Sequence, residues 1–173
     1  LINERAHANI QKDGTYSVVP RMWGGVTNPS ELRRIADVAD KYNVPMVKVT
    51  GGQRIDLLGI KKDDLPAVWK DLDMPSGHAY GKSIRTVKTC VGSEFCRFGT
   101  QNSTQLGIDL EHDLFNMWSP HKVKLAVSGC PRNCSEAGIK DVGIIGVDSG
   151  WEMYIGGNGG IKTEVAEFFV KLK

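Results

Sequence analysis

All four cysteines of this chain lie within residues 89–136, and their spacing limits what the chain can fold into. Cys90 and Cys96 form a C-x5-C pair, and Cys130 and Cys134 form a C-x3-C pair. Two local pairs of thiolates, brought together by the fold, would supply the ligands that a [4Fe–4S] cluster requires. The spacing therefore makes these cysteines candidate ligands of one metal centre.

The segment of the second cysteine pair predicts a short helix. Cys130 and Cys134 are four residues apart, which places them on one face of a helix. Pro131 suits the first helical position, so Cys130 is expected to cap the helix. A thiolate there would be stabilised by free backbone N–H groups and by the positive end of the helix dipole. Cys90 and Cys96 are too far apart for one helical turn and are expected on a loop or a strand-to-helix junction.

Other uses of four cysteines stay open at this point. Zinc also binds four thiolates, although its usual pairs are separated by about two to four residues, which a C-x5-C pair exceeds. Two disulfides would suit a secreted protein, and nothing in the sequence indicates secretion. Four unconnected thiols would require an accidental pairing. The spacing favours the cluster without excluding a zinc-stapled binding module.

Four stretches of the sequence resemble the sirohaem nitrite and sulfite reductase family. TCVGSEFCRFGT (89–100) and SGCPRNC (128–134) resemble the cysteine signature of that family. VVPRMWGGV (18–26) and TGGQRIDLLG (50–59) resemble its ferredoxin-like half-domain. The likeness covers most of the chain and is greatest toward the large subunits of NAD(P)H-dependent nitrite reductases.

The sequence predicts an α+β fold in two parts. In residues 1–88 a strand at 16–22 precedes a helix that Asn28 caps, and strands near 46–50 and 54–60 precede a helix that Asp63 caps. With the β-prone residues 84–91 as the last strand, the order βαββαβ is typical of a ferredoxin-like split unit. This part is the expected ferredoxin-like half-domain.

Residues 89–173 are expected to form an α/β domain, which the resemblance implies binds sirohaem and a [4Fe–4S] cluster. A helix near 104–115, weakened by Gly107, and a strand at 122–127 lead to Cys130. Two further strands follow. A last helix is expected after Thr163, because apolar residues recur at helical spacing. These are Val165, Phe168, Phe169 and Leu172.

The resemblance implies the six-electron reduction of nitrite to ammonia. It assigns the cluster to Cys90, Cys96, Cys130 and Cys134, and it implies that Cys134 also ligates the sirohaem iron. Sulfite reductases carry the same signature, so sulfite stays open as the substrate. A non-catalytic iron–sulfur electron carrier is a further alternative.

Two lysines precede Cys130 on the predicted strand. Lys122 and Lys124 alternate with Val123, so both ammonium groups leave the sheet on one face. A solvated sheet edge would explain the same pattern. The resemblance implies that they serve the anion site above the haem.

Four further residues are candidates through the resemblance. Arg21 lies on the turn where the family places an anion-binding arginine, and a guanidinium suits an oxyanion or a carboxylate. Gln53 and Arg54 are expected to contact a cofactor carboxylate. Arg97, directly after Cys96, is expected to be a charge partner of the cluster or the haem.

The net charge and the hydropathy of the chain limit the classes of partner that it is expected to bind. The net charge of +2 is too small to indicate nucleic-acid binding, and no apolar run approaches the ~18 residues of a membrane span. The chain begins at Leu1 without a basic and apolar leader, so it is expected to be a piece of a longer cytoplasmic protein.

The resemblance also implies partners beyond nitrite: the rest of the reductase large subunit and a small subunit. Stand-alone family members carry two copies of this half-unit with sirohaem between them, and this chain carries one. Either two chains pair as a homodimer, or the missing neighbours lie elsewhere in the subunit. FAD and NAD(P)H are expected only in those other parts, because no G-x-G-x-x-G follows a strand here.

Overall fold

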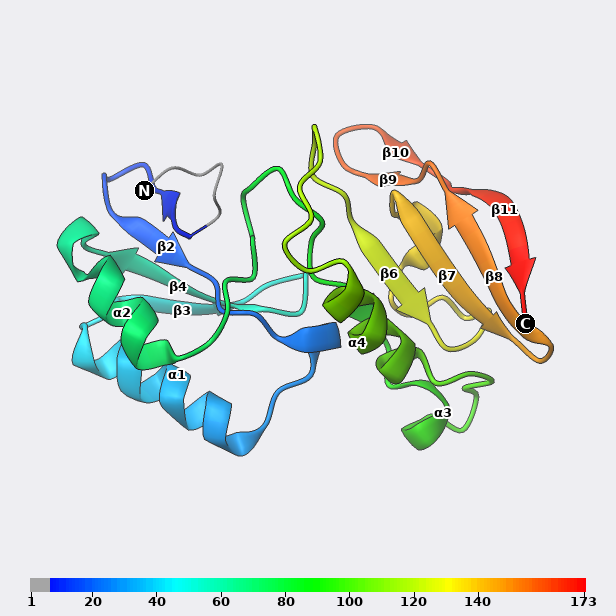
Figure 1. The fold of residues 1–173 in the computed structure, drawn as a ribbon, viewed down its shortest axis with the longest axis horizontal. Coiled ribbons are helices and arrows are strands. Elements are labelled where there is room, and N and C mark those ends of the chain that lie inside the picture. Colours follow the sequence, from blue (N-terminus) through cyan, green and yellow to red (C-terminus); the bar gives the residue numbers. More distant parts are fainter. Residues whose placement is uncertain (1–6) are drawn as a thin grey trace.

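The computed structural model describes residues 7–173, which form two main β-sheets that lie side by side (Figure 1). The predicted first domain starts at residue 1, and its first six residues lie outside the described ones. Helices accompany both sheets, which confirms the α+β class. Within the described range, no helix is both long and apolar enough to cross a membrane.

The first sheet has the strand order β1-β2-β4-β3, with every neighbouring pair antiparallel. Two helices, α1 and α2, pack against it and against each other (Figure 1). The elements of this half are β1 (Asn9–Ile10), β2 (Tyr16–Val18), α1 (Pro29–Lys41), β3 (Met46–Val49), β4 (Ile55–Ile60) and α2 (Leu65–Leu72).

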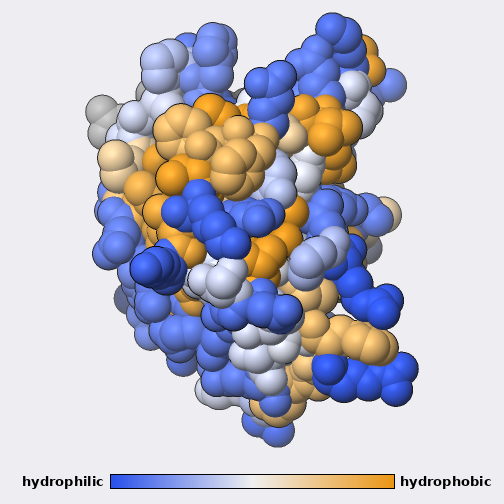
Figure 2. Space-filling model, turned by 90° about the vertical axis from the view of Figure 1, so that its right-hand side faces the viewer, coloured by the Kyte–Doolittle hydropathy of each residue, from blue (hydrophilic) through white to orange (hydrophobic). Residues whose placement is uncertain are grey.

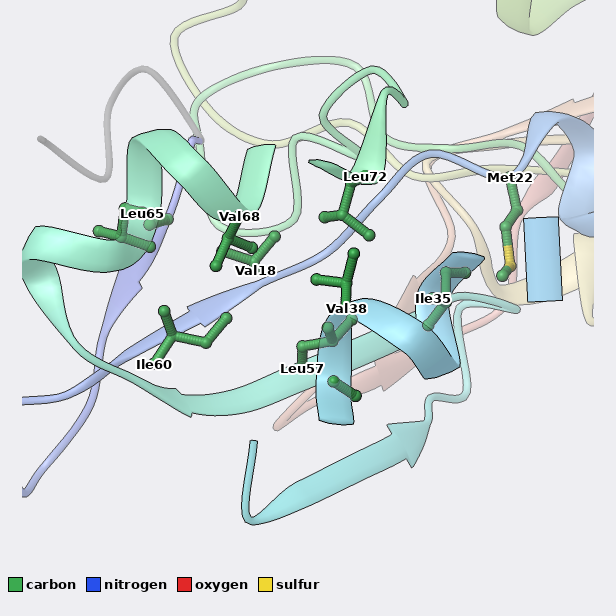
Figure 3. Packing of buried hydrophobic residues seen from close by; sticks show 11 residues of the cluster. Val18, Met22, Ile35, Val38, Leu57, Ile60, Leu65, Val68 and Leu72 are labelled. Atoms are coloured by element: carbon green, nitrogen blue, oxygen red, sulfur yellow. The ribbon is translucent and has the colours of Figure 1, made fainter. Parts of the chain in front are cut away.

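The core of this half lies between the two helices and strands β2 and β4. Figure 3 shows Val38 of α1 and Val68 of α2 facing the strand residues Val18 and Leu57. Val18, Leu57 and Val68 are completely buried. Each such side chain contributes roughly 1.5–3 kcal/mol by leaving water, so these contacts fix how the helices sit on the sheet.

The start of α1 agrees with the sequence prediction. Asn28 is extended, and its side-chain oxygen accepts a hydrogen bond of 2.9 Å from the N–H of Glu31. Pro29 occupies the first turn, where its missing N–H costs nothing. The start of α2 differs, because Asp63 lies in a 3-10 turn, η3 (Lys62–Asp64), and does not cap the helix.

The predicted βαββαβ order is wrong in its last strand. Of residues 84–91, only β5 (Lys88–Thr89) forms a strand, and it pairs in parallel with β6 (Leu125–Ser128) in the second sheet. The fourth strand of the first sheet is instead β1, which precedes β2 in the chain. Periodicity identified 84–91 as β-prone, but it carries no information on which sheet a strand joins.

The second sheet has the strand order β11-β8-β7-β6-β5. Its β5, β6 and β7 are parallel, whereas β8 and β11 are antiparallel to their neighbours. Helix α4 packs on β6 over a small core around Val87, Val127 and Ile144. The remaining elements are η2 (Trp23–Gly25), α3 (Gly92–Phe95), α4 (Ser103–Asp113), η4 (Ala137–Ile139), β7 (Val142–Val147), β8 (Gly150–Ile155), β9 (Asn158–Gly159), β10 (Thr163–Glu164) and β11 (Glu167–Leu172).

The helix predicted to start at Cys130 and to carry Cys134 is wrong. The segment is a series of turns that ends at η4. Asn133 and Glu136 have positive φ angles of 55° and 61°, which a right-handed helix does not allow. Cys130 is therefore not a helix cap.

The helix predicted after Thr163 is also wrong, because these residues form β10 and β11. β11 pairs with β8 at the edge of the second sheet, and Phe168 and Phe169 stay 57% and 61% exposed. Figure 2, which looks onto this side of the molecule, shows apolar side chains gathered among charged ones. The aromatic and β-branched residues of this segment favour a strand, and backbone pairing with β8 decided between the two structures.

Candidate functional site: a thiol hollow beside a basic pocket

The two cysteine segments meet at one edge of the second sheet. Cys90 follows β5 and Gly129 follows β6, and the carboxyl ends of neighbouring parallel strands lie at the same edge. The N–H of Gly129 donates to Sγ of Cys90 over 3.1 Å. The N–H of Thr100, beyond Cys96, donates to the carbonyl of Gly129 over 2.8 Å. The fold thus brings the residue before Cys130 into contact with the other cysteine pair.

Cys90 and Cys134 line a common hollow of about 390 Å³, which we call the thiol hollow. Cys130 is buried, Cys90 and Cys96 are half-buried, and Cys134 is exposed; all four are free thiols. The residues of the hollow are Gly24, Gly25, Val26, Gln53, Thr89, Cys90, Val91, Thr104 and Cys134.

The four thiols do not converge on a point that would suit a single ion. Among residues 7–173, no group of three or more His, Cys, Asp or Glu side chains is arranged to hold one metal ion. Zinc needs its thiolate sulfurs about 2.3 Å from one centre, so this geometry gives the zinc alternative no support. Cys90 and Cys134, from the two cysteine segments, line the thiol hollow, whereas Cys96 and Cys130 are not among its lining residues; a multinuclear group, which takes each thiolate at a separate metal atom, needs no common centre.

A second hollow of about 340 Å³, which we call the basic pocket, is lined in part by residues from 85–88 and 122–125, just before the two cysteine segments. Its cationic residues are Arg54, Arg85, Lys88, Lys122, Lys124 and Lys140. Lys122 and Lys124 both line it, as expected of alternate residues, although the regular strand begins only at Leu125. The Glu136 carboxylate forms ion pairs with Lys88 and Lys140, at 3.0 Å each. The other four cations of the pocket form no ion pair with Glu136.

Two half-buried arginines of the basic pocket, Arg54 and Arg85, lie close enough for their charges to affect each other, and Arg54 also feels the charge of Arg21. Burial lowers the pKa of Arg54, and the charge of Arg21 adds to that effect. Burial and the charge of Arg54 lower the pKa of Arg85 to about 10. The Nε groups of Arg54 and Arg85 have no hydrogen-bond partner in the described part of the chain. Arg54 Nη1 donates to the carbonyl of Gly77 over 3.3 Å, so what each arginine leaves unused is its buried Nε–H, a group that suits an anion.

In two segments of the chain, one residue lines the thiol hollow and the residue next to it lines the basic pocket. Gln53 lines the thiol hollow and Arg54 the basic pocket. Thr89 likewise lines the thiol hollow, and Lys88 lines the basic pocket. The hollows therefore lie on opposite sides of these two segments, which form their common wall.

The side chain of Gln53 bonds the backbone of Thr89. Its Nε2 donates to the carbonyl of Thr89 over 2.7 Å, and its Oε1 accepts from the N–H of Thr89 over 2.9 Å. The side chain thus ties the first half of the chain to the residue before Cys90.

Arg21 lies outside both hollows, in a buried ion pair. Its Nη1 is 2.7 Å from Oε1 of Glu111, and both side chains are 1% exposed. The Glu111 carboxylate also accepts the N–H groups of Gly24 and Val87. Burial raises the pKa of Glu111, whereas the hydrogen bond from Gly24 and the charge of Arg21 act in the opposite direction. Arg21 therefore holds α4, η2 and the strand before Cys90 together.

Arg97 is exposed and lies over the ring of Phe98, with its Cζ 4.6 Å from the ring centroid. Arg132, from the second cysteine segment, lies over the same ring at 4.0 Å. The two arginines thus join the cysteine segments through one aromatic ring. Neither is among the lining residues of the two hollows.

The sequence did not identify Arg85, Lys88 and Lys140 as site residues. Arg85 and Lys88 precede Cys90 much as Lys122 and Lys124 precede Cys130, and this parallel could have found them. Nothing in the sequence around Lys140 indicates a site residue, because Lys140 reaches the pocket only through the packing of η4 against β7.

Family models match both halves of the chain. "Nitrite and sulphite reductase 4Fe-4S domain" matches residues 80–173, and "Nitrite/Sulfite reductase ferredoxin-like half domain" matches residues 9–75. The division of the chain at residues 88 and 89 stays a prediction.

Curated proteins that are similar to this chain include nitrite reductases and a sulfite reductase. "Nitrite reductase [NAD(P)H]" of Bacillus subtilis is 67% identical over 173 residues, which are 100% of this chain and 22% of that protein. "Nitrite reductase (NADH) large subunit" of Escherichia coli is 48% identical over 95% of this chain and 20% of that protein. The assimilatory-type sulfite reductase of Nitratidesulfovibrio vulgaris is 38% identical over 92% of this chain and 74% of that protein. The chain thus spans about a fifth of the nitrite reductases that it matches.

The structure of Mycobacterium tuberculosis NirA matches 98% of this chain and 34% of that chain, with a TM-score of 0.78 at 20% identity. At that identity the likeness concerns the fold.

Proposed function

This chain belongs to the nitrite and sulfite reductase family, and from that membership we propose that it forms the catalytic segment of an NAD(P)H-dependent nitrite reductase large subunit. The proposed reaction is the six-electron reduction of nitrite to ammonia. The nitrite reductases among its relatives are more similar to it than the sulfite reductase, which favours nitrite as the substrate.

In this proposal Cys90, Cys96, Cys130 and Cys134 bind a [4Fe–4S] cluster, and Cys134 also reaches the iron of a sirohaem. The contact between Gly129 and Cys90 supports the joining of the two cysteine pairs. Exposure of Cys134 on the thiol hollow supports its role as the bridging ligand. When bound, the cluster and the sirohaem would supply the electrons and the iron on which nitrite is reduced.

The single observation that carries the proposal is the basic pocket that shares a wall with the thiol hollow. Arg54 and Arg85 are half-buried there, and their buried Nε–H groups have no partner among the described residues, which would suit carboxylates of a macrocycle. Lys122 and Lys124 line the same pocket and would hold the substrate anion and donate protons as its N–O bonds break.

Arg21 is proposed to act through its neighbours. Its ion pair with Glu111 fixes Gly24 and Val87, which flank the two hollows. Gln53 is proposed to act in the same way on Thr89. Arg97 is proposed to contribute positive charge near Cys96.

The remaining partners are proposed from the family. FAD and NAD(P)H would bind in other parts of the large subunit, and a small subunit would complete the enzyme. A second copy of this chain, as a homodimer, would supply the half-unit that two-copy family members carry within one chain.

The proposal is tested on the full-length protein, purified without oxygen. We expect reduced protein to consume nitrite with ammonia as the product and to turn over sulfite more slowly. Cys134→Ser should abolish the reduction, while Lys12→Ala, an exposed cation outside the site, should leave it intact. Near-normal turnover by Cys134→Ser would exclude the bridging role. A cluster spectrum that nitrite does not alter would favour an electron carrier instead.

A further inference from the structure

The sulfur of Cys90 has two polar neighbours. The N–H of Gly129 donates to it over 3.1 Å, and Oγ of Ser103 lies 3.2 Å away. Ser103 is completely buried. Such a donor beside a metal-binding sulfur is a means of adjusting the metal's reduction potential.

The hydroxyl of Ser103 is held in place by close packing. Ser103 is the first residue of α4, after the cap residue Asn102, whose side chain accepts the N–H of Gln105. A Cβ added at Gly92 would lie 2.9 Å from this hydroxyl, and one at Gly129 would lie 3.1 Å from it. Two glycines thus allow both cysteine segments to approach the serine.

The hydroxyl has one proton and two acceptors within reach, Sγ of Cys90 and, at 2.9 Å, the carbonyl oxygen of Cys90. That carbonyl already accepts the hydroxyl of Thr104 over 3.0 Å. A cysteine bound to metal is a thiolate and can only accept. The carbonyl oxygen has two lone pairs and can accept from both hydroxyls, but a charged thiolate is the stronger acceptor, so a metal-bound Cys90 takes the Ser103 proton to its sulfur whether or not Thr104 bonds the carbonyl.

We propose that Ser103 is a redox-tuning residue, whose hydroxyl bonds the Cys90 thiolate and raises the reduction potential of the cluster. The inference rests on the proposed function, because it requires a cluster on Cys90. Reduction adds one electron, so the reduced cluster carries more negative charge on its sulfurs. A hydrogen-bond donor stabilises that form more than the oxidised one.

The test is a reductive titration of the cluster, followed by EPR, in anaerobically purified full-length protein. Ser103→Ala removes the donor and keeps the backbone N–H that bonds Gln101. Ser103→Cys retains a weaker donor of similar shape. Thr104→Val is the matched control, because it removes the hydroxyl that serves the Cys90 carbonyl and leaves the sulfur's neighbours in place.

We expect a more negative midpoint potential in Ser103→Ala, an intermediate value in Ser103→Cys and the wild-type value in Thr104→Val, all with normal iron and sulfide content. An unchanged potential in Ser103→Ala would overturn the inference. Equal shifts in Ser103→Ala and Thr104→Val, or loss of the cluster in Ser103→Ala alone, would overturn it in favour of backbone anchoring. Wild-type protein without a cluster signal would instead contradict the proposed function.

Discussion

The side-chain amide of Gln53 pairs with the backbone of Thr89 through two hydrogen bonds, of 2.7 Å from Nε2 to the carbonyl and of 2.9 Å from the N–H to Oε1. The two residues are 36 positions apart: Gln53 lies in the turn between β3 and β4 of the first sheet, and Thr89 belongs to β5 of the second. Gln53 has a φ of 57°, a conformation that a residue with a side chain rarely adopts. The bond pair therefore fixes Thr89, and with it Cys90, against the first half of the chain.

Replacing Gln53 by Leu should destabilise the protein by about 2 kcal/mol or more, because it leaves both backbone groups of Thr89 without their partner. Urea unfolding measures this loss. Gln105→Leu is the control, since the Gln105 side chain is exposed and bonds only its helix neighbour Asp109. Equal losses in the two variants would show that the contact with Thr89 has no special weight.

Replacing Glu111 by Gln should destabilise the protein by about 3 kcal/mol or more. The amide would leave Arg21 buried without its counter-charge and would turn a donor toward groups that are themselves donors. Thermal unfolding compares it with Asp71→Asn, which breaks the exposed Lys41–Asp71 pair of similar length. The exposed pair should matter far less, and a similar loss in both would contradict the structural role of the Arg21–Glu111 pair.

His78 should make stability depend on pH between about 4 and 6.5. Burial, aided by the charge of Arg21, lowers its pKa from 6.5 to about 4. The unfolded chain then binds the proton more tightly in this window, so stability from this group is present above pH 6.5 and falls as the pH approaches 4, by at most about 3 kcal/mol.

The measurement is urea unfolding as a function of pH for wild type and His78→Asn. Asn removes the titrating group and tolerates the positive φ of 48°. The variant should have the weaker pH dependence across this window. Parallel curves for the two proteins would show that folding does not change the pKa of His78, which contradicts the prediction.

The basic pocket should bind multivalent anions when no cofactor is present. Inorganic pyrophosphate should raise the melting temperature of cofactor-free protein, because it binds only where the fold gathers cations. Lys124→Glu should reduce that rise, and Lys12→Glu, on an exposed turn away from the pocket, should not. Identical responses from both variants would mean that the stabilisation arises elsewhere.

Some local signals in the sequence predicted the structure correctly, whereas the helices expected at Cys130 and after Thr163 did not form. Asn28 and Pro29 mark the start of α1, and the family motifs predicted the two-part fold. Gly107, expected only to weaken a helix, has a packing reason instead: a Cβ there would overlap Cγ2 of Thr89.

Other features depend on contacts between distant residues. Glu111 lies 90 positions from Arg21, and nothing near either residue indicates the pairing. The apolar spacing from Val165 to Leu172 suits a helix, but the segment forms a strand because its backbone pairs with the edge of β8. Sequence patterns record such choices only weakly, because both structures satisfy the same local rules.

The most direct test of the account is the metal and cofactor content of the full-length protein purified without oxygen. The account predicts about four irons and about four sulfides per chain in a cluster, together with sirohaem, and loss of the cluster signal when Cys90 or Cys130 is replaced by Ser. Colourless protein with stoichiometric zinc, or a cluster that survives the replacement of either cysteine, would contradict it.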